Sequence, residues 1–329
     1  MSGLDSLLRR QPPSAWERFC SSPSLFIART LYSNVCLPLS EPEATTVTST
    51  NSRGKPSLIR IVCISDTHST HSSQPALPDG DILIHAGDLT HSGTPTELSD
   101  ALSWLSAQPH AHKIVIAGNH DTALADPIQR TSLLREHASD SDSLVYLEDE
   151  DVTLLVRGRS VRVYGSPRTP RHGSWAFQYP RVRPGGHSTQ SQSEFDLDVW
   201  GNIPTLTDVL VTHGPPFSHL DLNGAGCHAL LAALWRIRPR LHVFGHIHGA
   251  RGVEHVRWSR AQKAYEDVCA GQSAWGGLVR LVFWSVVERF NLLWKTMGDR
   301  GREEGTIMVN AAVGGVRDEQ RRGAIVVQI

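Results

Sequence analysis

Short apolar runs recur along the chain from residue 58 onward, and several of them end abruptly in polar residues. Residues 58–65 (LIRIVCIS) form one such run, rich in β-branched side chains, which predicts a buried strand. Helical patterns lie between the runs, and the one over residues 96–107 follows Pro95, which suits a first helical turn. This alternation predicts an α/β layered fold. Strands are also predicted over residues 82–85, 113–117, 209–212 and 241–244, a helix over 230–237, and a hairpin around Gly158 from 152–156 and 161–164, so the sheet is expected to be mixed.

The first 57 residues lack this pattern. Their prolines and the polar stretch over residues 45–52 leave few positions that could form a core, which favours a disordered tail. The alternative is that residues 25–37 dock loosely onto the domain that follows, over residues 58–329. No apolar run follows Arg9 and Arg10, so a secretory signal is not expected.

Residues 258–305 are predicted to be an insertion that contains an unusually apolar helix. The segment over residues 278–294 (LVRLVFWSVVERFNLLW) is interrupted by Arg280, Glu288 and Arg289, which makes it a poor membrane-spanning segment. Three interpretations stay open: a helix that covers the core, an interfacial membrane helix with Trp284 and Trp294 at its edges, and a helix that docks a partner.

Composition narrows the class of protein. Hydrophobic residues make up 40% and charged residues 20% of the 329 positions, as in soluble globular proteins. Lys and Arg total 32 and Asp and Glu 33, so no charge excess signals nucleic-acid binding. The five cysteines form no CxxC pair, which argues against a disulfide framework and favours a reducing, intracellular and cytoplasmic location. Membrane association through the apolar helix and the oligomeric state stay open.

Clusters of Asp, His and Asn follow five of the predicted strands. Ligands of α/β sheets collect at the carboxyl ends of strands, so these clusters are expected to converge on one site. Carboxylate, amide oxygen and imidazole together suit Zn, Mn or Fe, whereas calcium prefers oxygen alone. One such match would be an ordinary turn or helix cap, but five in order favour a metal site. The clusters are Asp66-Thr67-His68, Gly87-Asp88, Gly118-Asn119-His120-Asp121, Thr212-His213-Gly214-Pro215-Pro216, and Gly245-His246-Ile247-His248.

Spacing within the clusters supports this interpretation. In an extended segment alternate side chains project the same way, so Asp66 can face one metal together with His68. The same holds for His246 and His248. Glycines at positions 87, 118 and 245 would let the backbone turn sharply and approach a ligand closely.

The order DxH, GD, GNH[DE], H and GHxH resembles the signature of the calcineurin-like metallophosphoesterase superfamily. Further segments are similar to its metallophosphoesterase-domain-containing (MPPED) subgroup, and the resemblance covers residues 58–257 and 306–329. It implies a four-layer α-β-β-α sandwich with mixed sheets and a metal site at the carboxyl ends of the strands. Arg168 departs from the subgroup, which usually has an aromatic residue there. The similar segments are YGSP (164–167), WAF (175–177), DVLVTHGPP (208–216), LHVFGHIHG (241–249) and TIMVNA (306–311).

The resemblance also implies a role for each motif residue and a reaction. It implies two metal ions, Mn, Fe or Zn, and hydrolysis of a small phosphodiester, such as a cyclic nucleotide, by a hydroxide that bridges them. His120 would lie beside the metals and protonate the leaving group. A phosphomonoesterase, a protein phosphatase and a catalytically weak binding scaffold are the alternatives. Asp66, His68 and His248 would hold the first metal, Asp88 would bridge both, and Asn119, His213 and His246 would hold the second.

Overall fold

The structure is a computed structural model that describes residues 14–36, 58–137, 144–181, 199–295, 305–314 and 322–329. The backbone divides into two compact units. The larger unit comprises Ser40–Trp258 and Glu304–Ile329, and the smaller one comprises Met1–Leu39 and Ser259–Glu303. The smaller unit therefore joins the N-terminal segment to the predicted insertion.

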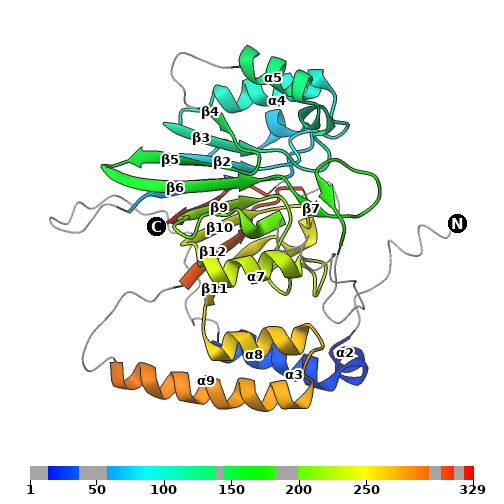
Figure 1. Cartoon of the computed structure of the whole chain (residues 1–329), viewed down its shortest axis with the longest axis vertical. Helices are drawn as coiled ribbons and strands as arrows, with labels where there is room; N and C mark the ends of the chain where they lie inside the picture. Colours follow the sequence, from blue (N-terminus) through cyan, green and yellow to red (C-terminus); the bar gives the residue numbers. More distant parts are fainter. Residues whose placement is uncertain (1–13, 37–57, 138–143, 182–198, 296–304, 315–321) are drawn as a thin grey trace, which may run out of the picture. The chain divides into compact units, whose positions relative to one another are not determined.

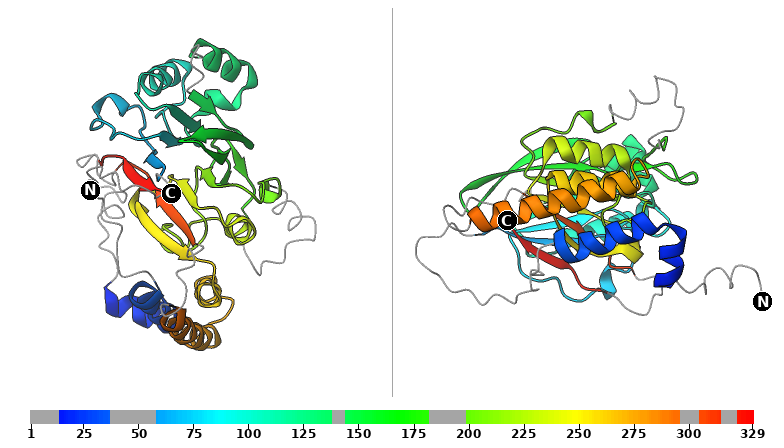
Figure 2. Two further views of the ribbon diagram at one scale, coloured as in Figure 1. Left: turned by 90° about the vertical axis from the view of Figure 1, so that its left-hand side faces the viewer. Right: turned by 90° about the horizontal axis from the view of Figure 1, so that it is seen from below.

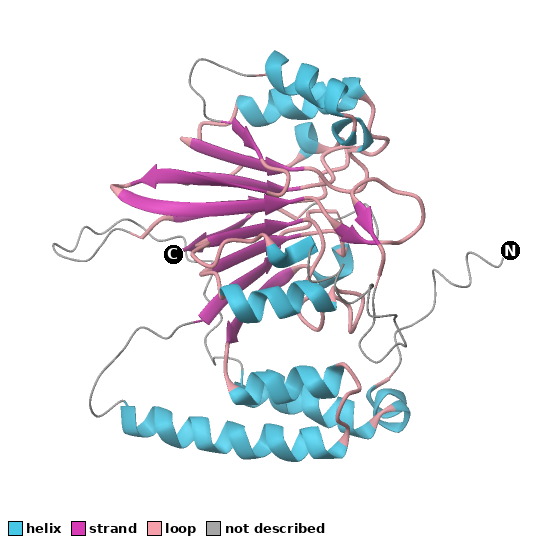
Figure 3. Cartoon of the chain, viewed as in Figure 1, coloured by secondary structure: helices cyan, strands magenta, loops and turns pink. Residues whose placement is uncertain are grey.

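Two β-sheets form the centre of the larger unit (Figure 3). The first has the strand order β13-β1-β2-β3-β4 and the second β11-β12-β10-β9-β6-β5, while β7 and β8 form a small separate pair. The strands of the first sheet are β1 (Arg60–Ile64), β2 (Ile82–Ala86), β3 (His112–Ile116), β4 (Leu144–Tyr146) and β13 (Ile325–Gln328). Those of the second are β5 (Glu150–Val156), β6 (Arg159–Ser166), β9 (Val209–Thr212), β10 (Leu241–Phe244), β11 (Gly252–Arg257) and β12 (Gly305–Asn310), and the small pair is β7 (Thr169–Pro170) and β8 (Gln178–Tyr179).

Helices cover the outer faces of both sheets (Figures 1 and 2). Side chains that alternate along the strands pack between the two sheets, among them Ile61, Ile84 and Val243. On the other face of the first sheet, Val62 belongs to a cluster with Leu102 of α4 (Pro95–Ser106); α5 (Pro127–Glu136) adds Leu133 to the same cluster. On the other face of the second sheet, α7 (His228–Ile237) packs in the same way. The predicted four-layer α-β-β-α sandwich is confirmed.

Strand direction brings the polar clusters to one edge of each sheet. β1, β2, β3 and β4 run parallel, as do β6, β9, β10 and β12. The predicted hairpin is present, with Val156 of β5 opposite Arg159 of β6 and Gly158 in the left-handed region at φ 76°. β13 joins β1 antiparallel, so the sheets are mixed as expected. Short 3-10 helices follow the strand ends at η2 (His71–Ser73), η3 (Thr122–Ala125) and η4 (His248–Ala250).

The smaller unit is a helical cluster. The ring of Tyr32 stacks on that of Tyr265 at 3.8 Å between centroids, and its hydroxyl lies 2.7 Å from Gln262 Oε1. The expected disorder is therefore wrong for residues 14–36, because the insertion supplies an apolar partner for them. Docking, the alternative for residues 25–37, describes them better, although residues 1–13 and 37–57 lie outside the described residues. The helices are α2 (Ala15–Ser21), α3 (Pro23–Leu31), η1 (Tyr32–Cys36), α8 (Arg260–Cys269) and α9 (Trp275–Lys295).

The apolar segment over residues 278–294 forms most of α9. Leu278 and Leu281 are buried against α3 and α8, so the interpretation as a covering helix describes one face of α9. Within the described residues, no helix combines the length and the apolar character that crossing a membrane requires.

The buried histidine of β10 predicts a pH dependence of stability. His242 is fully buried and donates from Nε2 to the hydroxyl of Thr212 at 2.8 Å, and burial lowers its pKa to about 3, with a smaller contribution from His219. Because the unfolded chain binds a proton near pH 6.5 and the folded chain does not, this residue costs about 1.4 kcal/mol of stability per pH unit below that value. Comparing the free energy of unfolding of the parent chain and His242→Gln between pH 8 and pH 4 should show a shallower loss in the variant. Parallel losses would contradict the assignment.

Candidate metal centre

The five polar clusters predicted from the sequence meet at the carboxyl ends of the parallel strands. Three groups of side chains each have one ligand atom within 4.8 Å of the others: Asp66, His68 and His248; Asp88, His213 and His246; and His68, Asp88 and His120. The shared members place all three groups in one site. Asn119 joins the second group, because its Oδ1 lies 3.1 Å from His213 Nε2. The structure thus brings together every residue that the sequence suggested for the site.

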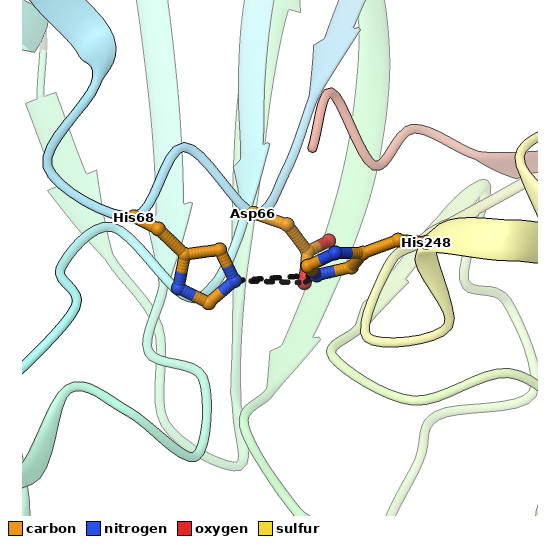
Figure 4. A group of neighbouring side chains, drawn as sticks. All are labelled: Asp66, His68 and His248. Atoms are coloured by element: carbon orange, nitrogen blue, oxygen red, sulfur yellow. Dashed lines mark hydrogen bonds and ion pairs between the residues drawn. The ribbon is translucent and has the colours of Figure 1, made fainter. Parts of the chain in front are cut away.

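The first group lies around the carboxylate of Asp66, which follows β1 (Figure 4). His248 Nε2 donates to Asp66 Oδ1 at 3.1 Å, and His68 Nε2 lies 4.0 Å from the same oxygen. The backbone N–H of His246 donates to both Asp66 oxygens, at 3.1 and 3.0 Å. His68 Nε2 and His248 Nε2 lie 3.2 Å apart. Three side chains from two distant segments therefore direct donor atoms at one point.

The second group lies around Asp88, which follows β2. His213 Nε2 lies 3.3 Å from Asp88 Oδ2, and His68 Nε2 lies 3.7 Å from the same oxygen. The ring of His246 stands edge-on to that of His213 at 5.0 Å between centroids. Asp88 therefore lies between the first and second groups, the place expected for a bridging ligand.

The backbone of these loops adopts conformations that ordinary residues avoid. The φ angles of Asp66, His68, Asp88 and His246 are 58°, 43°, 53° and 67°, all in the left-handed region. Such strain is maintained where the surrounding structure fixes the chain, and it often accompanies function. Four members of one site are therefore held in strained positions.

Two glycines leave room for the carboxylates. A Cβ at Gly118 would collide with Asp88 Oδ1, and a Cβ at Gly245 would collide with Asp66 Oδ2. These glycines permit close approach without a left-handed φ, whereas Gly87 combines close approach with a φ of 93°. The sharp turn expected at all three glycines is thus present as a left-handed turn only at Gly87.

Backbone carbonyls orient two of the imidazoles. His213 donates from Nδ1 to the carbonyl of Ala86 at 2.9 Å, and His68 donates from Nδ1 to that of Thr90 at 3.2 Å. Each donation leaves Nε2 as the nitrogen that faces the carboxylates, so its lone pair becomes available to a metal that displaces a proton from it. Metal-binding histidines are usually held in this way, since the second nitrogen fixes the tautomer and the ring plane.

Opposite charges compensate the burial of the two carboxylates. Burial by itself would raise the pKa of Asp66, but the hydrogen bond from His248 and the charges of nearby histidines hold it well below its usual range. Burial likewise acts against charge on His213, yet the charge and hydrogen bond of Asp88 raise its pKa to about 9. Burial lowers the pKa of His246 to about 4, so this ring is neutral. The two buried carboxylates therefore need positive charge close to them.

These properties fit a pair of transition-metal ions. Buried carboxylates, imidazole nitrogens and an amide oxygen are the donors that Zn, Mn and Fe accept, and a metal would replace the proton on His213 as the balancing cation. Asp66, His68 and His248 could hold one ion, Asn119, His213 and His246 a second, and Asp88 could contact both.

His120 lies at the solvent side of the site. Its backbone N–H donates to Asp88 Oδ1 at 2.8 Å, and its Nδ1 donates to the carbonyl of His91 at 2.8 Å. The ring stacks on Trp175 at 4.3 Å between centroids, and Trp175 is 45% exposed. Since Nδ1 is engaged, Nε2 is the nitrogen available to a substrate.

Asp121 has a structural role that the sequence did not specify. Its side chain is fully buried and accepts from the N–H groups of Gly118, Leu89 and Thr90 at 2.8, 3.1 and 3.0 Å. The hydroxyl of Thr90 donates to it at 2.7 Å. Asp121 thus joins the loop that carries Asp88 to the loop that carries Asn119, and its place beside the GNH motif was the only sequence signal for this.

The arginine that departs from the subgroup pattern is held by a local ion pair. Arg168 Nε lies 2.6 Å from Asp149 Oδ2, and Asp149 also accepts from the hydroxyl of Ser166 at 2.7 Å. This contact fixes the loop that follows β6 and engages much of the charge of Arg168.

Comparisons with known proteins agree with this geometry. The family model for calcineurin-like phosphoesterases matches residues 59–250. The chain is 45% identical over 331 aligned residues to a protein of Emericella nidulans named probable rhamnogalacturonate lyase C, an alignment that covers 99% of this chain and 29% of that protein. It is 39% identical over 221 residues to human metallophosphoesterase domain-containing protein 1, covering 60% of this chain and 63% of that protein.

A UPF0046 protein of Caenorhabditis elegans is 34% identical over 226 residues, which cover 60% of this chain and 53% of the relative. The chain thus spans less than two thirds of the length of each of these relatives. The family model covers more than half of the chain and includes every candidate ligand from Asp66 to His248. The chain therefore belongs to the calcineurin-like phosphoesterase family, within its MPPED-like subgroup.

Proposed function

We propose that this protein hydrolyses a small phosphodiester, such as a cyclic nucleotide, at a site that holds two metal ions. The proposal rests on two buried carboxylates that lie within reach of several imidazole nitrogens. Next to them lies His120, which contacts the site but is not fully buried. A structural role alone would not require donor atoms of this kind in strained loops. The family relationship gives phosphoester hydrolysis as the reaction class.

Each part of the site has a distinct task in this proposal. When bound, two ions would polarise the phosphoryl oxygens and lower the pKa of water. Asp66 and Asp88 supply the negative charge that retains cations, and carbonyl-bound His68 and His213 keep their Nε2 lone pairs directed inward. His120 delivers a proton from Nε2 to the leaving oxygen, while Nδ1 stays bound to the carbonyl of His91.

Two features favour a diester over a monoester. Trp175 stacks on His120 and keeps part of its surface exposed, so it offers an aromatic face to the organic group of an ester, such as a nucleobase. Arg168 Nε is paired with Asp149, which offsets part of the positive charge that the second negative charge of a monoester would need. A phosphomonoesterase is the second candidate, because the ligand groups by themselves suit both reactions.

The same donor chemistry leaves three metals as candidates. Mn, Fe and Zn all accept carboxylate oxygen and imidazole nitrogen, and two-metal hydrolysis does not require a change of oxidation state. We propose one of these three for each position. Metal analysis of the purified protein, together with a panel of monoester, diester and cyclic phosphate substrates, would identify both the ions and the ester class.

Separate variants distinguish the two roles in the site. Asp88→Ala should lose bound metal and activity together, because it removes the carboxylate shared by both groups. His120→Ala should keep its metal and lose about 10²- to 10⁴-fold in kcat on a phosphodiester whose leaving group is an aliphatic alcohol, since general acid catalysis contributes that much. Metal content by atomic spectroscopy and kcat, measured on the same preparations, check this.

A leaving group that needs no proton provides the control. Activated esters with a leaving group of low pKa should be less affected by His120→Ala than esters of aliphatic alcohols. Equal losses on both substrates would remove the acid role from His120. Full activity of the parent protein in excess chelator would contradict the two-metal proposal.

The contacts of Asp121 predict a metal-affinity effect at a distance. Asp121→Asn replaces one accepting oxygen with an N–H donor that faces backbone N–H groups, so the two ligand loops should separate. We expect about 10- to 100-fold weaker metal retention in a competition with chelator, as for other residues that support ligands. Asp126→Asn is the matched control, because Asp126 caps α5 through the N–H groups of Ile128 and Gln129. Equal retention in both variants would show that Asp121 does not support the metal site.

A further inference from the structure

Helix α9 has two apolar faces, but only one of them is packed. Leu278 and Leu281 are buried against the other helices of the smaller unit, and Trp284 packs partly against the same cluster. The second face carries large apolar side chains that are between 45% and 69% exposed. They are Trp275, Val279, Val282, Phe283, Val286 and Phe290.

These side chains form one continuous stripe. Their spacing of three or four residues places them within an arc of about 100° on a helix of 3.6 residues per turn. Thirteen large apolar side chains are exposed among the described residues, and six of them lie on this stripe, so it is a concentration and not scattered exposure. The stripe extends from Trp275 to Phe290 of α9, which corresponds to about 23 Å along the helix axis.

The exposed charges beside the stripe are basic. Arg289 lies at one edge of the stripe and Arg280 beyond the other, and both are exposed. Glu288, the one acidic residue of α9, is turned toward α8, where its Oε1 accepts from the N–H of Ala261 at 3.1 Å. On α8 the exposed charged side chains are Arg260 and Lys263. Asp267 of α8 is mostly buried and pairs with Lys263 at 3.1 Å and with Arg280 at 3.8 Å. Among the described side chains of α8 and α9, every charged one that is exposed is therefore basic, and Arg289 adds a further positive charge to this surface.

We propose that this stripe of α9 is a membrane-binding surface that lies in the interface of an anionic lipid bilayer. An apolar face with aromatic side chains and flanking arginines is the pattern of helices that lie in the plane of the interface. The arginines extend their charged ends to lipid phosphates while their stems stay with the apolar layer. The exposed cations of α8 and α9 complement the negative surface of such a membrane. No described helix spans a bilayer, so the contact is peripheral.

Vesicle flotation with the full-length protein tests the proposal. The parent chain should float with vesicles of phosphatidylcholine and phosphatidylserine, and bind less to phosphatidylcholine alone. Phe283→Ser combined with Phe290→Ser should reduce the partition coefficient at least about tenfold, because two aromatic side chains lose their burial in lipid. Arg280→Gln combined with Arg289→Gln should reduce binding to anionic vesicles and leave the weak binding to neutral vesicles unchanged.

A matched control separates this surface from general stickiness. Ile128→Ser combined with Leu206→Ser removes two apolar side chains that are 82% and 79% exposed in the larger unit, and binding should stay at the parental level. Failure of the parent chain to float with anionic vesicles would overturn the proposal, as would equal flotation of the double phenylalanine variant.

A second copy of this chain could cover the stripe of α9 in place of a lipid surface, and a separate measurement distinguishes the two. Sedimentation of the parent without lipid should show the same oligomeric state as the double phenylalanine variant. A parent dimer that becomes monomeric in that variant would assign the stripe to self-association and overturn the lipid assignment. Neither measurement depends on the proposed phosphodiesterase activity, so the two proposals can fail separately.

Discussion

Two buried carboxylates carry negative charges that the rest of this structure must balance. Asp66 and Asp88 are 1% and 2% exposed and share one site, and buried negative charges are costly unless cations or N–H donors surround them. Histidines from later strands supply the positive charge, and backbone N–H groups of His120 and His246 supply the donors. Two sheets packed face to face bring these segments together, because their parallel strands end at the same side.

The loops that hold these carboxylates are strained and tightly connected. Left-handed backbone at Asp66 and Asp88 costs free energy, which the hydrogen bonds of the loops and the packing of the sheets offset. Asp121 connects the loop after β2, which carries Asp88, to the loop after β3, which carries Asn119. The positions of these two candidate ligands are therefore coupled. A site of this kind is preorganised: the donor atoms are in place because their supports leave them few alternatives.

Within its described residues, the smaller unit is stabilised by packing between helices and not by a network of buried charges. Its helices bury one another through residues far apart in the chain, such as Tyr32 and Gln262, which are separated by 230 positions. α9 contributes Leu278, Leu281 and part of Trp284 to this packing and presents a second apolar stripe outward. The unit is therefore stabilised by one of the two apolar faces of α9.

Much of the larger unit could be predicted from the sequence, since its signals are local. A buried strand reads as an apolar run, α4 begins at a capping box of Thr94 and Glu97, and each ligand motif directly follows its strand. Tertiary structure alone decided the rest. The N-terminal helices, the hydrogen bonds of Asp121 and the exposed face of α9 depend on partners that lie far away in sequence or, for the exposed face, on the lack of one within the described residues. Periodicity shows which side chains avoid water, but only packing determines which surface removes them from it.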